Sequence, residues 1–169
     1  MKIIWPYVMN DERGDPIDYG CVVTKDIEGD LEVLGYICLV VEPYTGYKYD
    51  AKAHPTVAHV AKMLPTNTLE EADEEIANFI KTYLEEGERV IAVLWDDDIG
   101  DGDYPYVGAL IAENPADILF MDQIQTMIDV MGLPCEHRHS DADAVGVERA
   151  VQGALRNHQE FMVYRNNLL

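Results

Sequence analysis

The first fifty residues alternate between short apolar runs and clusters of turn-forming residues, a pattern typical of strands. Apolar and aromatic residues fill the runs 3–9, 19–24 and 31–42. Each run has the length of an ordinary strand, so we expect three strands joined by tight connections. Because Pro6 has no backbone N–H to donate to a ladder, the first strand is expected at a sheet edge or with a bulge.

The middle of the chain changes to helical spacing. A short amphipathic helix is expected over 56–64 and is ended by Pro65. A second helix begins at Thr68, whose hydroxyl forms a capping box with the carboxylate of Glu71. Apolar residues then recur at intervals of three and four, and Gly87 is the expected left-handed stop.

The second half repeats the order of strands followed by helices. The runs 89–95 and 106–112 are joined by a short connection, which favours an antiparallel hairpin. A helix is expected from the Asn114 cap to a stop at Gly132, and the last helix starts at a capping box over 140–143. The predicted apolar face of this last helix comprises Val147, Val151, Leu155, His158 and Met162.

The resulting order is three strands, two helices, two strands and two helices (βββααββαα). Grouped strands favour an α+β class, an antiparallel or mixed sheet of about five strands with helices packed on it, over a doubly wound fold. The length of 169 residues suits one domain, and no linker interrupts it, so residues 1–169 are predicted to form a single compact domain.

The chain has the features of a cytoplasmic protein. No apolar run approaches the ~20 residues of a membrane span, and the N-terminal residues do not form a secretory signal. Cys21, Cys38 and Cys135 are too few and too scattered for a disulfide scaffold. We therefore expect reduced thiols and a cytoplasmic location.

Charge is the unusual property of the composition. The chain has 32 Asp and Glu against 12 Lys and Arg, a formal net charge of −20. Such a surface repels phosphate, so direct binding to nucleic acid or to an anionic membrane is not expected. A basic protein surface is the expected partner. Adaptation to high salt is the other interpretation of the same composition.

Acidic residues concentrate most strongly after the fourth predicted strand. The spacing does not fit an EF-hand, because Gly100, Asp101 and Val107 fall at positions that require other residues. Three interpretations stay open: a solvated hairpin tip, a Ca²⁺ or Mg²⁺ site, and imitation of a row of phosphates. The candidate partner-binding residues here are Asp96, Asp97, Asp98, Asp101, Asp103 and the adjoining Tyr104.

A second acidic group occupies the first turns of the helix that begins after Thr68. Carboxylates are favoured there by the helix dipole, and a solvated helix face is the simpler interpretation. As a binding surface, the group adds carboxylates to those of the acidic loop. Its candidate residues are Glu70, Glu71, Glu74 and Glu75.

The segment before the last helix concentrates side chains that bind metals. In an extended strand Cys135, His137 and His139 would share one face, and thiolate and imidazole suit zinc. These three ligands are one short of a closed tetrahedral site, and Asp141 is the further candidate metal ligand. The alternative is a loop that leads into a helix cap. His158 is interpreted as a satisfied structural histidine.

Two classes of function follow. The favoured one is an acidic, non-enzymatic protein-binding protein with no catalytic residues and no cofactor. In its most specific form it is a nucleic-acid mimic that inhibits a basic nucleic-acid-binding protein, and in size and charge it resembles the small anti-restriction and anti-CRISPR inhibitors of phages. The alternatives are a small zinc-dependent hydrolase, with zinc held by the Cys135–His139 segment, and an acidic structural subunit.

Overall fold

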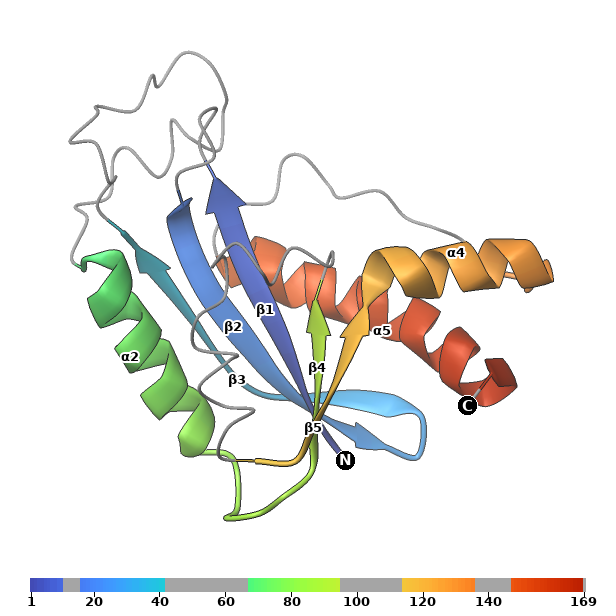
Figure 1. The fold of residues 1–169 in the computed structure, drawn as a ribbon, viewed down its shortest axis with the longest axis horizontal. Coiled ribbons are helices and arrows are strands. Elements are labelled where there is room, and N and C mark those ends of the chain that lie inside the picture. The colour runs from blue at the N-terminus through green and yellow to red at the C-terminus, as the bar shows by residue number, and fades with distance from the viewer. Residues whose placement is uncertain (11–15, 42–66, 95–113, 136–146, 169) are drawn as a thin grey trace.

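The structure, a computed structural model, describes residues 1–10, 16–41, 67–94, 114–135 and 147–168, and the structural statements below concern this part of the chain. It contains five strands and three helices (Figure 1). These are β1 (Lys2–Asn10), β2 (Pro16–Ile27), β3 (Asp30–Val40), α2 (Leu69–Lys81), β4 (Val90–Leu94), β5 (Ala116–Phe120), α4 (Met121–Met131) and α5 (Val147–Leu168).

The five strands form one mixed sheet in the order β3-β2-β1-β4-β5. The pairs β1–β2 and β2–β3 are antiparallel, whereas β4 runs parallel to both β1 and β5. A mixed five-stranded sheet with packed helices confirms the predicted α+β class.

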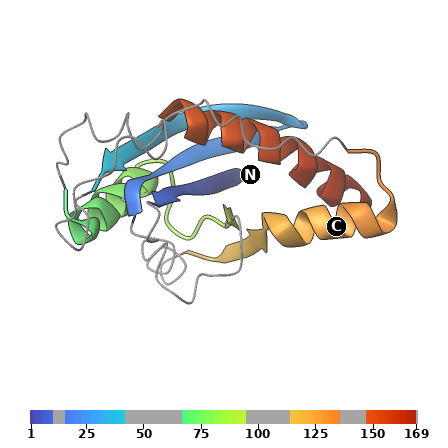
Figure 2. The same cartoon turned by 90° about the horizontal axis from the view of Figure 1, so that it is seen from above.

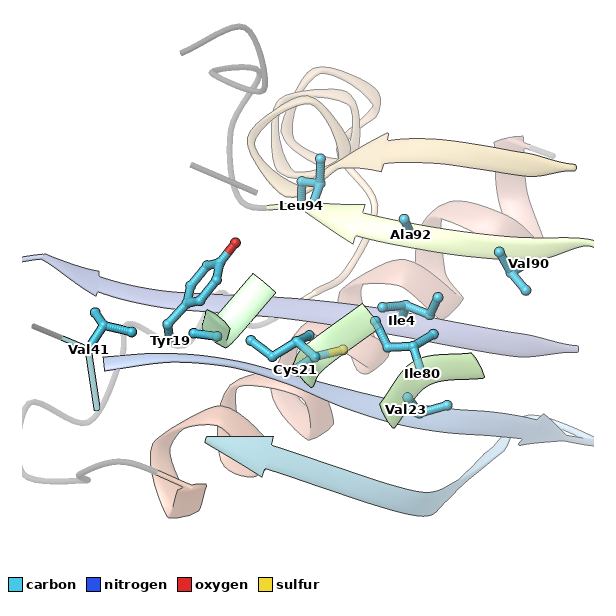
Figure 3. Close-up of a cluster of buried hydrophobic side chains, with 11 residues drawn as sticks. Ile4, Tyr19, Cys21, Val23, Val41, Ile80, Val90, Ala92 and Leu94 are labelled. Carbon is cyan, nitrogen blue, oxygen red and sulfur yellow. The ribbon is translucent and has the colours of Figure 1, made fainter. Parts of the chain in front are cut away.

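Helices cover both faces of this sheet, as the views in Figures 1 and 2 show. Ile4 and the alternate residues of the neighbouring strands pack with α2 in one buried cluster (Figure 3). Ile3 and Trp5 point to the opposite face, where they pack with residues of α4 and α5. Adjacent residues of a strand point to opposite faces, so β1 and β4 contribute to both clusters and are buried on both sides.

The first strand is not at a sheet edge, which was one of the two alternatives expected from Pro6. β1 lies in the centre of the sheet, between β2 and β4. The ladder to β4 ends at the pair Ile4–Ala92, before Pro6, so the missing N–H of Pro6 interrupts no bond to β4. The register of β1 and β2 does shift, but between Met9 and Asn10 rather than at Pro6.

The segment from Asn114 is a strand before it is a helix, which corrects the predicted helix start. Residues 116–120 form β5, parallel to β4, and α4 starts at Met121. Ile118 fits the spacing of a helix and the alternation of a strand equally well, so periodicity could not show which of the two this segment forms. The expected hairpin partner 106–112 lies outside the described residues.

Two details of the predicted helices also change. Gly87 has the expected left-handed backbone, with φ of 74°, but α2 has already ended at Lys81 with a cap at Thr82. On α5, Leu155 is 43% exposed, and the buried residues are Ala154, His158, Glu160 and Phe161. The helices expected over 56–64 and at the cap 140–143 lie outside the described residues.

A hydrogen bond between two buried side chains joins β1 to β2 and gives a testable prediction of stability. The indole Nε1 of Trp5 donates to Oγ1 of Thr24 over 2.8 Å, and both side chains are buried. The change Thr24→Val keeps the shape but leaves the indole N–H without its acceptor. We expect a loss of about 1–3 kcal/mol of unfolding free energy, measured by urea denaturation. A loss no larger than that of Thr82→Val, an exposed control, would contradict this.

Candidate functional site

The acidic helix α2 is held firmly at its N-terminus. The backbone N–H of Thr68 donates to Oε2 of Glu71 over 2.8 Å, and the N–H of Glu71 donates to Oγ1 of Thr68 over 3.2 Å. The predicted capping box is therefore confirmed. Ala72, Ile76 and Ile80 are fully buried against the sheet, which fixes the opposite side of the helix toward solvent.

One side-chain hydrogen bond ties α2 to the sheet at a defined place. The hydroxyl of Tyr19, which is fully buried on β2, donates to Oδ1 of Asp73 over 2.6 Å. At the other end of the helix, Tyr83 lies directly over Gly35 of β3. A Cβ atom at Gly35 would come within 2.2 Å of the tyrosine oxygen, so glycine permits this close approach.

The four glutamates predicted on this helix all lie on its exposed side. Glu71 serves the capping box, and Glu75 accepts a bond of 3.0 Å from the side chain of Asn67. Glu70 and Glu74 have no partner within the part of the chain that the structure describes. We call this group the acidic face of α2, and it comprises Glu70, Glu71, Glu74 and Glu75.

Like charges one turn apart on a helix repel each other by a few tenths of a kcal/mol, about 0.2–0.5 for each pair. The acidic face of α2 contains two such pairs, Glu70 with Glu74 and Glu71 with Glu75. Proximity to the positive end of the helix dipole offsets part of this repulsion. A basic ligand would offset the rest, so the arrangement favours binding of cations or of Lys and Arg side chains.

The acidic face also lies at a particular edge of the sheet. Because β1, β4 and β5 are parallel, their carboxyl ends meet at one edge, which we call the carboxyl edge. Tyr19 pairs with Val8 near the end of β1 and holds Asp73 through its hydroxyl. The first turns of α2 therefore lie at the carboxyl edge, as Figure 1 shows.

The other acidic candidates continue the chain from this edge. Leu94 ends β4, and the sequence proceeds from it through Trp95 to the acidic loop. β1 ends at Asn10, which Asp11 and Glu12 follow in the sequence. These segments lie outside the described residues, as do the candidates Asp96, Asp97, Asp98, Asp101, Asp103 and Tyr104.

The structure describes one of the four candidate metal ligands. Cys135 has a partly buried thiol that is not in a disulfide and packs against the core cluster beneath α4 and α5. His137, His139 and Asp141 lie outside the described residues. Within the described ranges no three His, Cys, Asp or Glu side chains gather in a way that could hold a metal.

Cys21 is not suited to nucleophilic or ligand chemistry. Burial raises the pKa of its thiol far above the ordinary value, although a backbone hydrogen bond at Trp5 acts in the opposite direction. The thiol therefore stays protonated, whereas metal binding and nucleophilic attack need the thiolate. Cys21 is a core residue on the α2 side of the sheet.

One feature of this region was not predicted from the sequence. The bond between Tyr19 and Asp73 joins residues 54 positions apart, and no local pattern announces it. The positions Ala72, Ile76 and Ile80 did indicate which side of α2 is buried, and hence that the glutamates face solvent.

The comparisons with known proteins give no family for this chain. No family model matches it, and a search of curated proteins found no significant match. Among the helices that the structure describes, none is both long and apolar enough to cross a membrane.

Proposed function

We propose that this chain is an acidic, non-enzymatic protein-binding protein whose carboxylates occupy a basic site on another protein. In its most specific form it is a nucleic-acid mimic that inhibits a nucleic-acid-binding protein of the restriction or CRISPR type. The acidic face of α2 is the observation that carries the proposal. It presents four carboxylates on a helix fixed by a capping box, a buried side and the bond from Tyr19.

The proposed mechanism is electrostatic. Lys and Arg side chains that normally bind phosphate would pair with the carboxylates of α2 and of the acidic loop. A net charge of −20 attracts a basic protein over a long range, so association should be fast and strongly dependent on salt. Carboxylates on a helix are held in better-defined positions than carboxylates on a loop. This favours a single alignment with the basic side chains of the partner.

The unpartnered glutamates give a direct test. The double change Glu70→Gln with Glu74→Gln keeps the size of both side chains and removes two charges from the acidic face. We expect affinity for the partner to fall about tenfold at low salt, and its salt dependence to become weaker. The measurement is a titration of the captured partner by calorimetry at several salt concentrations.

The matched control removes two charges elsewhere. Glu28 and Glu32 are exposed on the β2–β3 hairpin, away from the carboxyl edge. Changing both to Gln should leave the affinity within about twofold, because distant surface charges are screened. Equal weakening by the control and by the α2 variant would show a general charge effect and would contradict the proposed surface.

A metal-dependent enzyme is the second candidate, and the sheet topology favours it. In open α/β sheets, ligands bind beyond the carboxyl ends of the strands, where the connection order changes. The parallel strands β1 and β4 meet at such a place, because β1 is followed by β2 on one side of the pair and β4 by β5 on the other. Carboxylates follow both β1 and β4 in the sequence, and such oxygen ligands suit Mg²⁺.

Metal titration separates this candidate from the binding protein, and zinc from magnesium. Stoichiometric Zn²⁺ that survives dialysis and is lost in His137→Ala would support the zinc hydrolase predicted from the sequence. Binding of Mg²⁺ that is lost in Asp96→Asn would support a site at the carboxyl edge. If neither metal binds and a chelator leaves the melting temperature unchanged, the enzyme candidate is contradicted.

A further inference from the structure

His158 occupies an unusual position on α5. Its side chain is only 5% exposed and lies among aromatic rings. The ring centroid is 6.4 Å from that of Trp5 and 6.3 Å from that of Phe161. Neither ring nitrogen has a hydrogen-bond partner among the residues that the structure describes. Within the described residues the ring therefore lacks a well-formed hydrogen bond, although the backbone of Gly29 lies close enough to act on it.

The ring of His158 lies beside the contact between α5 and the turn that joins β2 to β3. Arg165 of α5 forms an ion pair with Asp26, whose carboxylate is almost fully buried at the end of β2. The methyl group of Met162 lies against Gly29 in the turn. His158 is thus next to the contacts that hold the C-terminal half of α5 on the sheet.

Several charged groups act on the imidazole from the elements packed around it. Burial lowers the pKa of His158 below its ordinary value of 6.5, and the charge of Arg165 acts in the same direction. The backbone of Gly29 and the carboxylates of Asp26 and Asp30 act in the opposite direction, but they do not outweigh burial. The ring in the docked helix is therefore neutral at pH 7.

The sign of the pH dependence follows from this shift. When α5 leaves the sheet, His158 enters water and regains an ordinary pKa, so the released state binds a proton more readily than the docked state. The contribution of His158 to the free energy of docking is fully present above the ordinary pKa of 6.5. It decreases as the pH falls below that value, and it stops changing below the pKa of the docked state.

We propose that His158 makes the docking of α5 on the β2–β3 turn sensitive to pH, so that mild acid releases the C-terminal half of the helix. This device is independent of the proposed binding function, because the acidic face of α2 is on the opposite face of the sheet. Release would expose Trp5 and Phe161, which are buried in the docked state.

Hydrogen exchange of the full chain at pH 7.5 and pH 5.5, corrected for intrinsic rates, tests this proposal. We expect the opening of α5 to increase on acidification relative to the opening of β1 and β2. The increase should reach about tenfold for each unit that separates the pKa values of the docked and released states. His158→Leu, an apolar replacement, should abolish this difference. His59→Gln, which changes a histidine outside the described residues, should retain it.

Two outcomes would overturn the proposal. One is the same acid-induced opening of α5 in His158→Leu, and the other is equal opening of α5 and of the central strands. Comparison with the variant is essential, since acid also reduces the net charge of −20 and so relieves repulsion throughout the chain. If circular dichroism shows that His158→Leu does not fold, an NMR titration of His158 in the unaltered chain decides. A pKa at or above 6.5 contradicts the proposal, and a lower pKa supports it.

Discussion

Removal of the acidic loop's charges is expected to abolish most binding to the basic partner while the fold is retained. The variant replaces five aspartates by asparagine: Asp96, Asp97, Asp98, Asp101 and Asp103. These residues supply five of the formal 20 excess negative charges, in a segment that follows the carboxyl edge of the sheet. Close charge pairs across an interface are coupled by about 1.5–7 kcal/mol, so we expect affinity to fall on the order of 100-fold.

The measurement is a partner titration at three salt concentrations, with folding followed by circular dichroism and thermal melting. Association should slow in the variant more than dissociation accelerates, because long-range attraction mainly raises the association rate. An unchanged melting curve shows that the fold is intact. If affinity is also unchanged, the acidic loop is not part of the interface, and the acidic face of α2 must account for binding alone.

Truncation of Phe161 is expected to be the most damaging single change in the described core. The ring is fully buried and makes an edge-to-face contact with Trp5, with centroids 6.4 Å apart and planes at 90°. Phe161→Ala removes this contact and leaves a cavity between α5 and the sheet. We expect a loss of about 4 kcal/mol, a large part of the roughly 5–15 kcal/mol by which small proteins are stable.

Urea denaturation measures this loss, and Leu155→Ala on the same helix is the matched control. Leu155 is 43% exposed, so its truncation removes little buried surface and should cost less than about 1 kcal/mol. Similar losses in both variants would mean that α5 does not pack through the face that contains Phe161. A loss in Phe161→Ala several times larger than in Leu155→Ala would confirm the packing.

The sequence predicted those parts of the fold that depend on neighbouring residues. Thr68 and Glu71 form their capping box within one turn, and the apolar positions Ala72, Ile76 and Ile80 identify the buried side of α2. The turn between β2 and β3 was likewise visible, with Gly29 in a left-handed conformation at φ of 98°. Each of these features is decided by local geometry.

Pairing between distant strands was not predictable in the same way. Pro6 was expected to place β1 at a sheet edge or to give it a bulge, yet β1 lies in the centre of the sheet and its ladder to β4 stops before Pro6. Residues Ala116–Phe120 form a strand because they pair with β4. No periodicity within the segment could reveal that pairing. Leu155 fits the helical pattern but lies too far around α5 to reach the sheet.

The candidate site likewise combines one feature that was predictable from neighbouring residues with one that was not. The acidic face of α2 follows directly from the sequence, because charge and helix spacing are both local. Its place at the carboxyl edge does not, because that depends on the contact of Tyr19 with Asp73 and on the strand order. The topology thus brings the acidic face of α2 to the same edge of the sheet at which β4 ends.

Competition with nucleic acid tests the central claim most directly. The chain is immobilised, exposed to a cell lysate, and washed with rising salt or with DNA or RNA, and the released proteins are identified by mass spectrometry. The binding proposal predicts that one basic nucleic-acid-binding protein is retained at low salt and is displaced by both treatments. Retention of no basic protein, or of one that nucleic acid does not displace, would contradict the proposal that this chain imitates nucleic acid.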